Sequence, residues 1–155
     1  MFALNLKITQ MRIIETEVYT FDELSDDAKE NAKIELVSEY FWAGEATGSL
    51  YAFAEEIGIE ITDYSMDWCA YGRVNISWEW IDKVHTNDIT VEQFTGYCMD
   101  FPLIEEWNDT KDVAKAIGAW VNDCQKDYEY QQSDEFMIEH CEANKYEFTK
   151  EGKLI

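Results

Sequence analysis

The sequence predicts an α+β fold, with a small, mostly antiparallel sheet and about five helices packed on one face of it. Two neighbouring segments of the first half alternate apolar and polar residues, which is typical of strands, while most of the second half repeats its apolar residues with a helical period. Apolar residues make up 46% of the chain, including six Trp, nine Tyr and eight Phe, enough for a packed core. A length of 155 residues fits one globular domain over residues 1–155.

The first half contains the expected sheet. Alternation over 12–21 predicts an edge strand, and Ser25 is expected to cap a helix that reaches about Trp42. Gly44 and Gly48 are expected to interrupt the helical pattern, so that a second, shorter helix begins at Leu50 and stops at Gly58. Residues 59–68 and 72–81 then predict a hairpin turning at 69–72, with an apolar face on its second strand that consists of Val74, Ile76, Trp78 and Trp80.

The second half is predicted to be mainly helical. Thr90 opens a capping-box pattern for a helix to about Asp100, which Pro102 ends. Asp109 or Thr110 is expected to cap a longer helix, and Ser133 a short one. The apolar stripe of the longer helix consists of Val113, Ile117, Trp120, Val121, Cys124 and Tyr128. Residues 146–155 predict a terminal hairpin around Lys150-Glu151-Gly152.

The start of the chain and its thiols bear on location. The apolar stretch at 1–6 is too short for a signal peptide, and no apolar run approaches the roughly 18 residues of a membrane span. Because Met11 begins the first patterned segment, residues 1–10 are interpreted as an N-terminal extension. The four cysteines contain no Cys-x-x-Cys pair and are expected to be reduced thiols, in keeping with a cytoplasmic protein.

Signatures of catalysis are weak in this chain. His140 and Cys141 are adjacent on a predicted helix, where side chains point about 100° apart, so they cannot act as base and nucleophile on one another. No calcium-loop or zinc-protease spacing occurs, and no glycine-rich loop that would hold a phosphate. The prediction is therefore a protein that is not an enzyme and uses no cofactor or metal; a metal-dependent hydrolase built from scattered carboxylates remains one alternative.

Charge is the strongest signal for function. The chain carries 33 Asp and Glu against 12 Lys and Arg, a net charge of −21, whereas solubility needs only about 2–8 charges. Direct binding to nucleic acid is disfavoured, because Lys and Arg contacts to phosphate supply most of that affinity. Such an excess of carboxylates favours a basic protein partner, with two alternatives for the acids: a mimic of phosphates or a merely solvated surface.

Two groups of acids are expected to form the partner-binding surface. They flank the first helix and bracket the entry to the long helix: Asp22, Glu23, Asp26, Asp27, Glu30, Glu35 and Glu39, then Glu105, Glu106, Asp109 and Asp112. Further acids follow on the last two helices. Complementary charge would speed association with a basic groove, and exposed aromatic residues would anchor the contact.

Two stretches carry a family resemblance. Residues 19–32, YTFDELSDDAKENA, resemble the "FDELSDEAKEKAR" opening of a family of small phage and prophage proteins, and residues 128–152 are similar to the closing motif of that family. Some members are labelled as antitoxins of toxin–antitoxin stability systems. Members often have Arg-Glu-Trp-Tyr after the opening, where this chain has Ile34-Glu35-Leu36-Val37. The resemblance implies a phage or mobile-element origin and brings no catalytic residues.

Together these observations predict a phage-encoded anti-defence inhibitor in the host cytoplasm, of the anti-CRISPR or anti-restriction type. It would bind the basic, nucleic-acid-binding surface of a host protein, and its acids would either mimic nucleic acid or form a merely solvated surface. The alternatives are an antitoxin-like protein that neutralises one cognate toxin, and the carboxylate–metal hydrolase.

Overall fold

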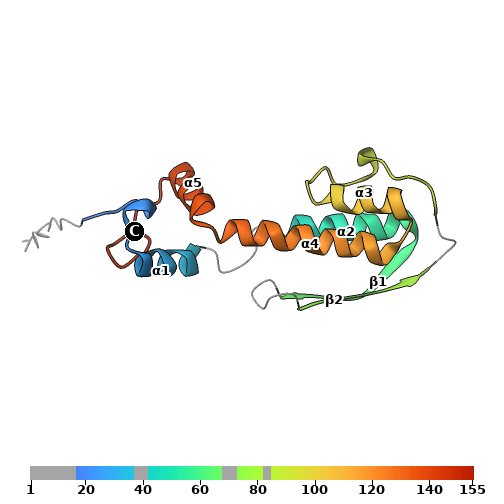
Figure 1. Ribbon diagram of the computed structural model, residues 1–155, viewed down its shortest axis with the longest axis horizontal. Helices are drawn as coiled ribbons and strands as arrows, with labels where there is room; N and C mark the ends of the chain where they lie inside the picture. The colour runs from blue at the N-terminus through green and yellow to red at the C-terminus, as the bar shows by residue number, and fades with distance from the viewer. Residues whose placement is uncertain (1–16, 37–41, 68–72, 82–84) are drawn as a thin grey trace, which may run out of the picture.

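The computed structural model describes residues 17–36, 42–67, 73–81 and 85–155 of the chain. It has an α+β fold with five α-helices and one antiparallel hairpin among these residues, as the sequence predicts. The molecule is elongated (Figure 1): α2, α3, α4 and the hairpin form one end, α1, α5 and the C-terminal segment form the other, and α4 runs between them. The predicted turn at 69–72 and the segment at 1–10 lie outside the described residues.

The predicted strand at 12–21 is wrong over the part that the structure describes. Tyr19 forms a single antiparallel bridge with Phe148, and the chain then enters a 3-10 turn at Phe21–Glu23. Among the described residues, the single bridge to Phe148 is the strand-like pairing that this segment makes. Helix α1 follows at Asp26–Leu36, and the Ser25 hydroxyl accepts a hydrogen bond from the Ala28 amide, as expected of the cap.

Helix α2 spans Ala43–Ile57, so the predictions that Gly44 and Gly48 interrupt the helix and that it begins at Leu50 are wrong. Both glycines lie within the helix because its apolar stripe, which includes Leu50 and Phe53, is fully buried, and tertiary packing outweighs the modest helix propensity of glycine. The predicted stop is confirmed: Gly58 adopts φ 80° and its amide donates to the Ala54 carbonyl.

Strands β1 (Ile59–Asp67) and β2 (Arg73–Trp80) form the predicted hairpin. Their inward-facing pairs include Ile61 with Trp78 and Tyr64 with Ile76, and an irregularity between Ile61 and Asp63 keeps the alternation in phase. The prediction of a core position for Trp80 is wrong. Trp80 is the last residue of β2, and its side chain is 44% exposed.

Helix α3 spans Asp100–Thr110, and the predicted helix from Thr90 is limited to a 3-10 turn at Val91–Gln93. Pro102 lies in the first turn of α3 instead of ending a helix. A proline is tolerated there because the first-turn amides have no partner within the helix. The capping-box pattern at Thr90 therefore did not identify the start of an α-helix.

The long helix α4 covers Val113–Gln131 and α5 covers Asp134–Asn144. Asp112 caps α4, its carboxylate accepting hydrogen bonds from the Ala114 and Lys115 amides, so the prediction of Asp109 or Thr110 as the cap is wrong. Those two residues belong to the last turn of α3. The Ser133 cap of α5 is confirmed by the hydrogen bond from the Phe136 amide to its hydroxyl, 3.2 Å.

The buried side chains of the described ranges form two separate clusters, one at each end of the molecule. The larger contains Trp107 and Trp120 with apolar residues of α2, α3, α4 and β1. The smaller contains Phe21, Met137 and Phe148 with residues of α1 and α5. The helices that cover the hairpin belong to the larger cluster. Division of the buried residues into two clusters is a feature that apolar periodicity alone does not reveal.

The C-terminal segment closes on itself as a tight turn and packs on α1. Phe148 bridges both Tyr19 and Leu154, which makes it the centre of a small three-stranded contact. The Thr149 amide donates to the Lys153 carbonyl at 2.8 Å, in agreement with the predicted hairpin at 146–155. Gly152 has φ +82° and lies so close to α1 that a β-carbon would overlap the carbonyl of Ala28.

Candidate functional site

The acids predicted around the first helix are exposed where the structure describes them, and we call this set the N-terminal acidic cluster. All of its described members are exposed: Asp22, Glu23, Asp26, Asp27, Glu30 and Glu35. Glu39, predicted with them, lies outside the described residues. The first two lie on the 3-10 turn and the others on α1, which repeats its buried alanines, Ala28 and Ala32, every four residues and leaves the intervening acids in solvent.

Several members of the N-terminal acidic cluster also have local structural roles. The Glu23 carboxylate accepts a hydrogen bond from the Thr20 amide at 2.9 Å, and Asp22 accepts one from the Thr20 hydroxyl. Glu35 accepts one from the Leu154 amide of the C-terminal segment. These contacts hold the acids in fixed positions, and a carboxylate has lone pairs left for further partners.

A shallow hollow of about 260 Å³ brings some of these acids together with α5. Its lining consists of Asp26, Asp27, Lys29, Glu30 and Asp134. Lys29 and Lys33 both form ion pairs with Asp134, at 3.6 and 2.7 Å, and Lys33 also contacts Glu30 at 3.2 Å. The two lysines of α1 are thus turned toward α5, whereas Asp26 and Asp27 face solvent.

These ion pairs alter the titration of their members. Burial lowers the pKa of the Lys33 ammonium, but its hydrogen bonds to Asp134 and Glu30 outweigh burial, so that the pKa lies above its ordinary value. The hydrogen bond from Lys33 lowers the pKa of Asp134, and burial opposes it only partly. Both groups are consequently charged at neutral pH.

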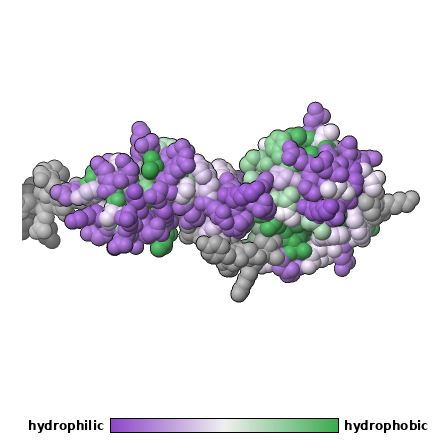
Figure 2. Space-filling model, in the orientation of Figure 1, coloured by the Kyte–Doolittle hydropathy of each residue, from purple (hydrophilic) through white to green (hydrophobic). Residues whose placement is uncertain are grey.

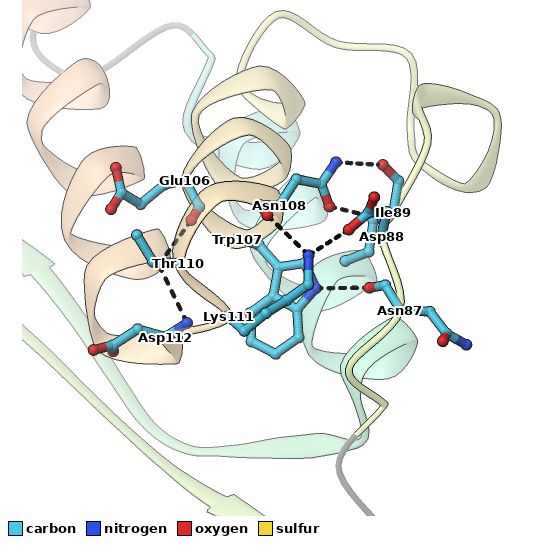
Figure 3. Close-up of polar contacts among 9 residues, drawn as sticks. All are labelled: Asn87, Asp88, Ile89, Glu106, Trp107, Asn108, Thr110, Lys111 and Asp112. Carbon is cyan, nitrogen blue, oxygen red and sulfur yellow. Dashed lines mark hydrogen bonds and ion pairs between the residues drawn. The ribbon is translucent and has the colours of Figure 1, made fainter.

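The second predicted group lies on a rigid support. Glu105, Glu106 and Asp109 lie on α3, with Glu106 only partly exposed, and Asp112 caps α4. Figure 3 shows how α3 holds the preceding segment: the Trp107 indole donates to the Asn87 carbonyl at 3.1 Å, and the Asn108 amide group bonds to both backbone groups of Ile89. Lys111 forms an ion pair with Asp88, which removes one more cation from the free surface.

The two predicted groups lie at opposite ends of the elongated molecule (Figure 1). The N-terminal acidic cluster belongs to the part built on the smaller buried cluster, and the acids of α3 belong to the part built on the larger one. The structure therefore does not assemble the predicted set into one compact site. Figure 2 shows hydrophilic side chains over much of both ends in that view.

Among the described residues, His140 and two of the thiols lie in packed surroundings. His140 stacks on Phe136 with ring centroids 5.5 Å apart and meets the edge of Tyr146. Cys141 is buried, and burial raises the pKa of its thiol to about 11. Burial raises the pKa of Cys124 as well, and its sulfur contacts the Met99 sulfur at 3.6 Å. Thiols with a raised pKa carry little thiolate at neutral pH and are poor nucleophiles.

One buried carboxylate escaped the sequence analysis. Asp100 is fully buried, and its two oxygens accept hydrogen bonds from the Thr95 hydroxyl at 2.8 Å and the Gly96 amide at 2.7 Å. Thr95 in turn contacts the Ser49 hydroxyl of α2. This arrangement fixes the loop before α3 to α2, which is a structural role. An Asp in the first turn of a helix, a few residues after Thr-Gly, is a common pattern, so the sequence could not predict that this carboxylate is buried.

An apolar groove was missed as well. It has a volume of about 290 Å³ and lies between β2 and α4. Its lining consists of Ile76, Trp78, Ala114, Ile117, Gly118 and Val121. Figure 2 shows apolar side chains gathered along the lower side of α4, next to the hairpin. The alternation of β2 predicted an inward face, but only the packing shows that α4 leaves part of that face uncovered.

Within the described part of the chain, no group of three or more His, Cys, Asp or Glu side chains is placed to hold a metal ion. None of the helices in the described ranges combines the length and apolar character needed to cross a membrane. Comparison with known protein families, with curated proteins and with solved structures gives no match to this chain.

Proposed function

We propose that this protein is a non-catalytic inhibitor that binds a basic, nucleic-acid-binding host protein, as an anti-defence protein of the anti-CRISPR or anti-restriction type does. The observation that carries the proposal is the N-terminal acidic cluster. Its carboxylates are exposed, while the neighbouring cations, Lys29 and Lys33, have only 18% and 15% of their side chains exposed and are paired with Asp134. Lys33 also pairs with Glu30, but none of the ion pairs among the described residues involves the other members of the cluster, so most of its negative charge has no cationic partner in that part of the chain.

The geometry favours imitation of phosphates. Asp26, Asp27 and Glu30 project from one short helix whose buried alanines fix it to the smaller cluster. A rigid array of carboxylates binds a basic groove with little loss of side-chain freedom, compared with acids on a flexible tail. Long-range attraction from a net charge of −21 would also raise the rate of association with a positively charged partner.

Charge reversal on α1 tests the proposal. The variant replaces Asp26, Asp27 and Glu30 by Lys, which removes the negative surface without touching the buried face. Two lysines in the first turn of a helix cost about 0.3–1 kcal/mol each through the helix dipole, and loss of the exposed pair of Glu30 with Lys33 costs about 0–1 kcal/mol, so the fold should persist. Circular dichroism and thermal melting check this.

A matched control carries the same change of charge on α5. Glu135, Glu139 and Glu142 replaced by Lys provide it, and Asp134 is left intact because its ion pairs with Lys29 and Lys33 link α5 to α1. The assay measures displacement of fluorescent duplex DNA or RNA from a panel of purified basic host nucleic-acid-binding proteins. We expect wild-type protein and the α5 variant to displace the nucleic acid and the α1 variant to lose at least tenfold in potency.

Ionic strength supplies a second readout, because charges farther apart than about 10 Å are largely screened at 0.1 M salt. Affinity for the partner should fall at least tenfold between low and high salt. Equal potency of the two variants, or an affinity insensitive to salt, would contradict the proposal. Displacement from one toxin alone would favour the antitoxin alternative, and consumption of the nucleic acid with Mg²⁺ or Mn²⁺ would favour the hydrolase.

A further inference from the structure

The groove between β2 and α4 has an unfilled apolar floor beside an open strand. Ile76 and Trp78 of β2 face Ile117 and Val121 of α4 across it. The inner-face side chains of β2 are only partly buried at Ile76 and Trp78, in contrast to the complete burial of the opposite part of the core at Leu50 and its neighbours. Additional apolar side chains would complete this packing.

The outer edge of β2 is available for pairing in the described part of the chain. The sheet consists of β1 and β2 alone, and no third strand pairs with β2 among the described residues. An open edge offers a row of backbone donors and acceptors to an incoming strand. Because side chains alternate between the two faces of a sheet, a strand added there would direct every second side chain over the groove.

The remaining side chains of an added strand would lie on the outer face of the hairpin, and the residues of that face indicate their charge. Glu60 and Glu79 are directly paired across β1 and β2, and both are exposed. Like charges directly opposite each other destabilise a sheet. None of the ion pairs within the described ranges involves either residue. A cationic side chain on a strand next to β2 would relieve this repulsion, so Lys or Arg fits the outward positions.

Gly118 provides an independent observation. It lies in the middle of α4 and lines the groove, although glycine costs about 0.5–1 kcal/mol relative to alanine inside a helix. Nothing lies within 4 Å of the position that its β-carbon would take, so internal packing does not require glycine there. Close approach of another backbone or side chain to the helix would require it.

We propose that the groove and the outer edge of β2 bind an extended segment of the basic partner by strand addition. Apolar side chains at alternate positions enter the groove over Gly118, and Lys or Arg between them meet Glu79 and Glu60. This rests on the proposed function, since it assigns the basic partner a second contact at the end of the molecule away from α1. A second copy of this chain is not the occupant, because two molecules of charge −21 repel each other.

The probe for this contact is a fluorescein-labelled, end-capped peptide of five Lys-Val repeats, and the readout is fluorescence anisotropy at fixed salt. A second peptide of the same composition carries N-methyl groups on alternate amides and cannot form the backbone ladder. We expect the first to bind at least tenfold more tightly than the second. Hydrogen exchange at the amides of β2 should slow when the first peptide is bound.

Gly118→Leu is the decisive variant, because it fills the groove floor and leaves the net charge unchanged. Gly44→Leu is its matched control: Gly44 is also exposed, helical and without a neighbour within 4 Å of its β-carbon position. Replacement of an exposed helical glycine by leucine should raise the melting temperature. A loss of peptide binding by Gly118→Leu could therefore not be attributed to unfolding. We expect at least a tenfold loss for Gly118→Leu, a smaller loss for Glu79→Gln, and none for Gly44→Leu.

Equal binding by the two leucine variants, equal affinity of the two peptides, or no binding of the Lys-Val peptide would each overturn this inference. Its failure is distinct from that of the proposed function. If charge reversal on α1 abolishes displacement of nucleic acid while Gly118→Leu retains it, the inhibitor function stands and the groove is not a contact. If the peptide binds as expected but no basic protein loses its nucleic acid, the groove stands and the inhibitor function fails.

Discussion

Lys33 of α1 and Asp134 at the start of α5 form an ion pair with a nitrogen–oxygen distance of 2.7 Å. The two residues are far apart in sequence, and their contact connects the first described helix to the last. Only 15% of the Lys33 side chain is exposed, so this pair is more shielded from solvent than an ordinary surface pair. The ammonium of Lys33 lowers the pKa of Asp134, which gives the contact a measurable dependence on pH.

Replacement of Asp134 by Asn should reduce the loss of stability in acid. The folded-state pKa of Asp134 is lower than its ordinary value of 3.8, so its stabilising contribution is present above that value and is lost as the pH falls through the folded-state pKa. Urea unfolding at pH 7 and at pH 2–3 measures this. At pH 7 the variant should be less stable by no more than about 1 kcal/mol, because the carboxylate is half exposed.

At the lowest pH, the wild-type protein and the Asp134→Asn variant should have the same free energy of unfolding. Glu129→Gln, which removes one exposed negative charge from the neighbouring helix, is the control for the change in net charge. A wild-type protein and an Asp134→Asn variant with parallel pH profiles would show that the ion pair contributes nothing to folding.

Gly152→Ala should destabilise the end of the molecule that contains α1 and α5. Gly152 combines φ +82° with an approach to α1 so close that a β-carbon would overlap the Ala28 carbonyl. Gly96→Ala is the matched control, because Gly96 has φ +85° and nothing within 4 Å of its β-carbon position. Both variants share the conformational cost of a positive φ, about 1 kcal/mol or more, and the additional loss at Gly152 measures the overlap.

Thermal melting followed by circular dichroism compares the two glycine variants. A lower melting temperature for Gly152→Ala than for Gly96→Ala would support the close packing of the C-terminal turn on α1. Equal melting temperatures would mean that the turn moves away from α1 without cost.

Trp107→Ala should destabilise the fold strongly, by about 3–5 kcal/mol, as expected for removal of a large core side chain. Trp107 is fully buried, packs edge-to-face on Phe53 and donates a hydrogen bond to the Asn87 carbonyl. Trp80→Ala should cost far less, because its side chain is 44% exposed and its neighbour Trp78 retains the inner-face contacts. Chemical denaturation of both variants decides the order, and a larger loss for Trp80→Ala would contradict the structure.

Asp112→Ala should remove the N-terminal cap of α4 and cost about 0.5–2 kcal/mol. Its carboxylate accepts hydrogen bonds from the Ala114 amide at 3.0 Å and the Lys115 amide at 3.2 Å. Asp109→Ala removes an equal charge from an exposed position within α3 and should change the free energy of unfolding by less than about 0.5 kcal/mol. Similar losses in the two variants would place the cap elsewhere.

The sequence by itself predicted the features that depend on neighbouring residues. The β1–β2 hairpin follows from alternation of apolar and polar residues, α4 from a stripe of Val113, Ile117, Trp120 and Cys124, and the stop at Gly58 from the conformational freedom of glycine. The Ser133 cap likewise depends on a hydrogen bond to an amide only three residues away. The acidic character of the surface is a property of composition and needs no fold.

Only the tertiary structure decided which local signals prevail. Gly44 and Gly48 remain helical because the apolar stripe around Leu50 is buried against α3 and the hairpin, whereas the capping pattern at Thr90 is followed only by a 3-10 turn at Val91–Gln93. The separation of the acids on α1 from those on α3, and the uncovered groove over Gly118, depend on how α4 connects two buried clusters. Contacts between residues distant in sequence determine these features, because burial of apolar surface outweighs the small differences in local propensity.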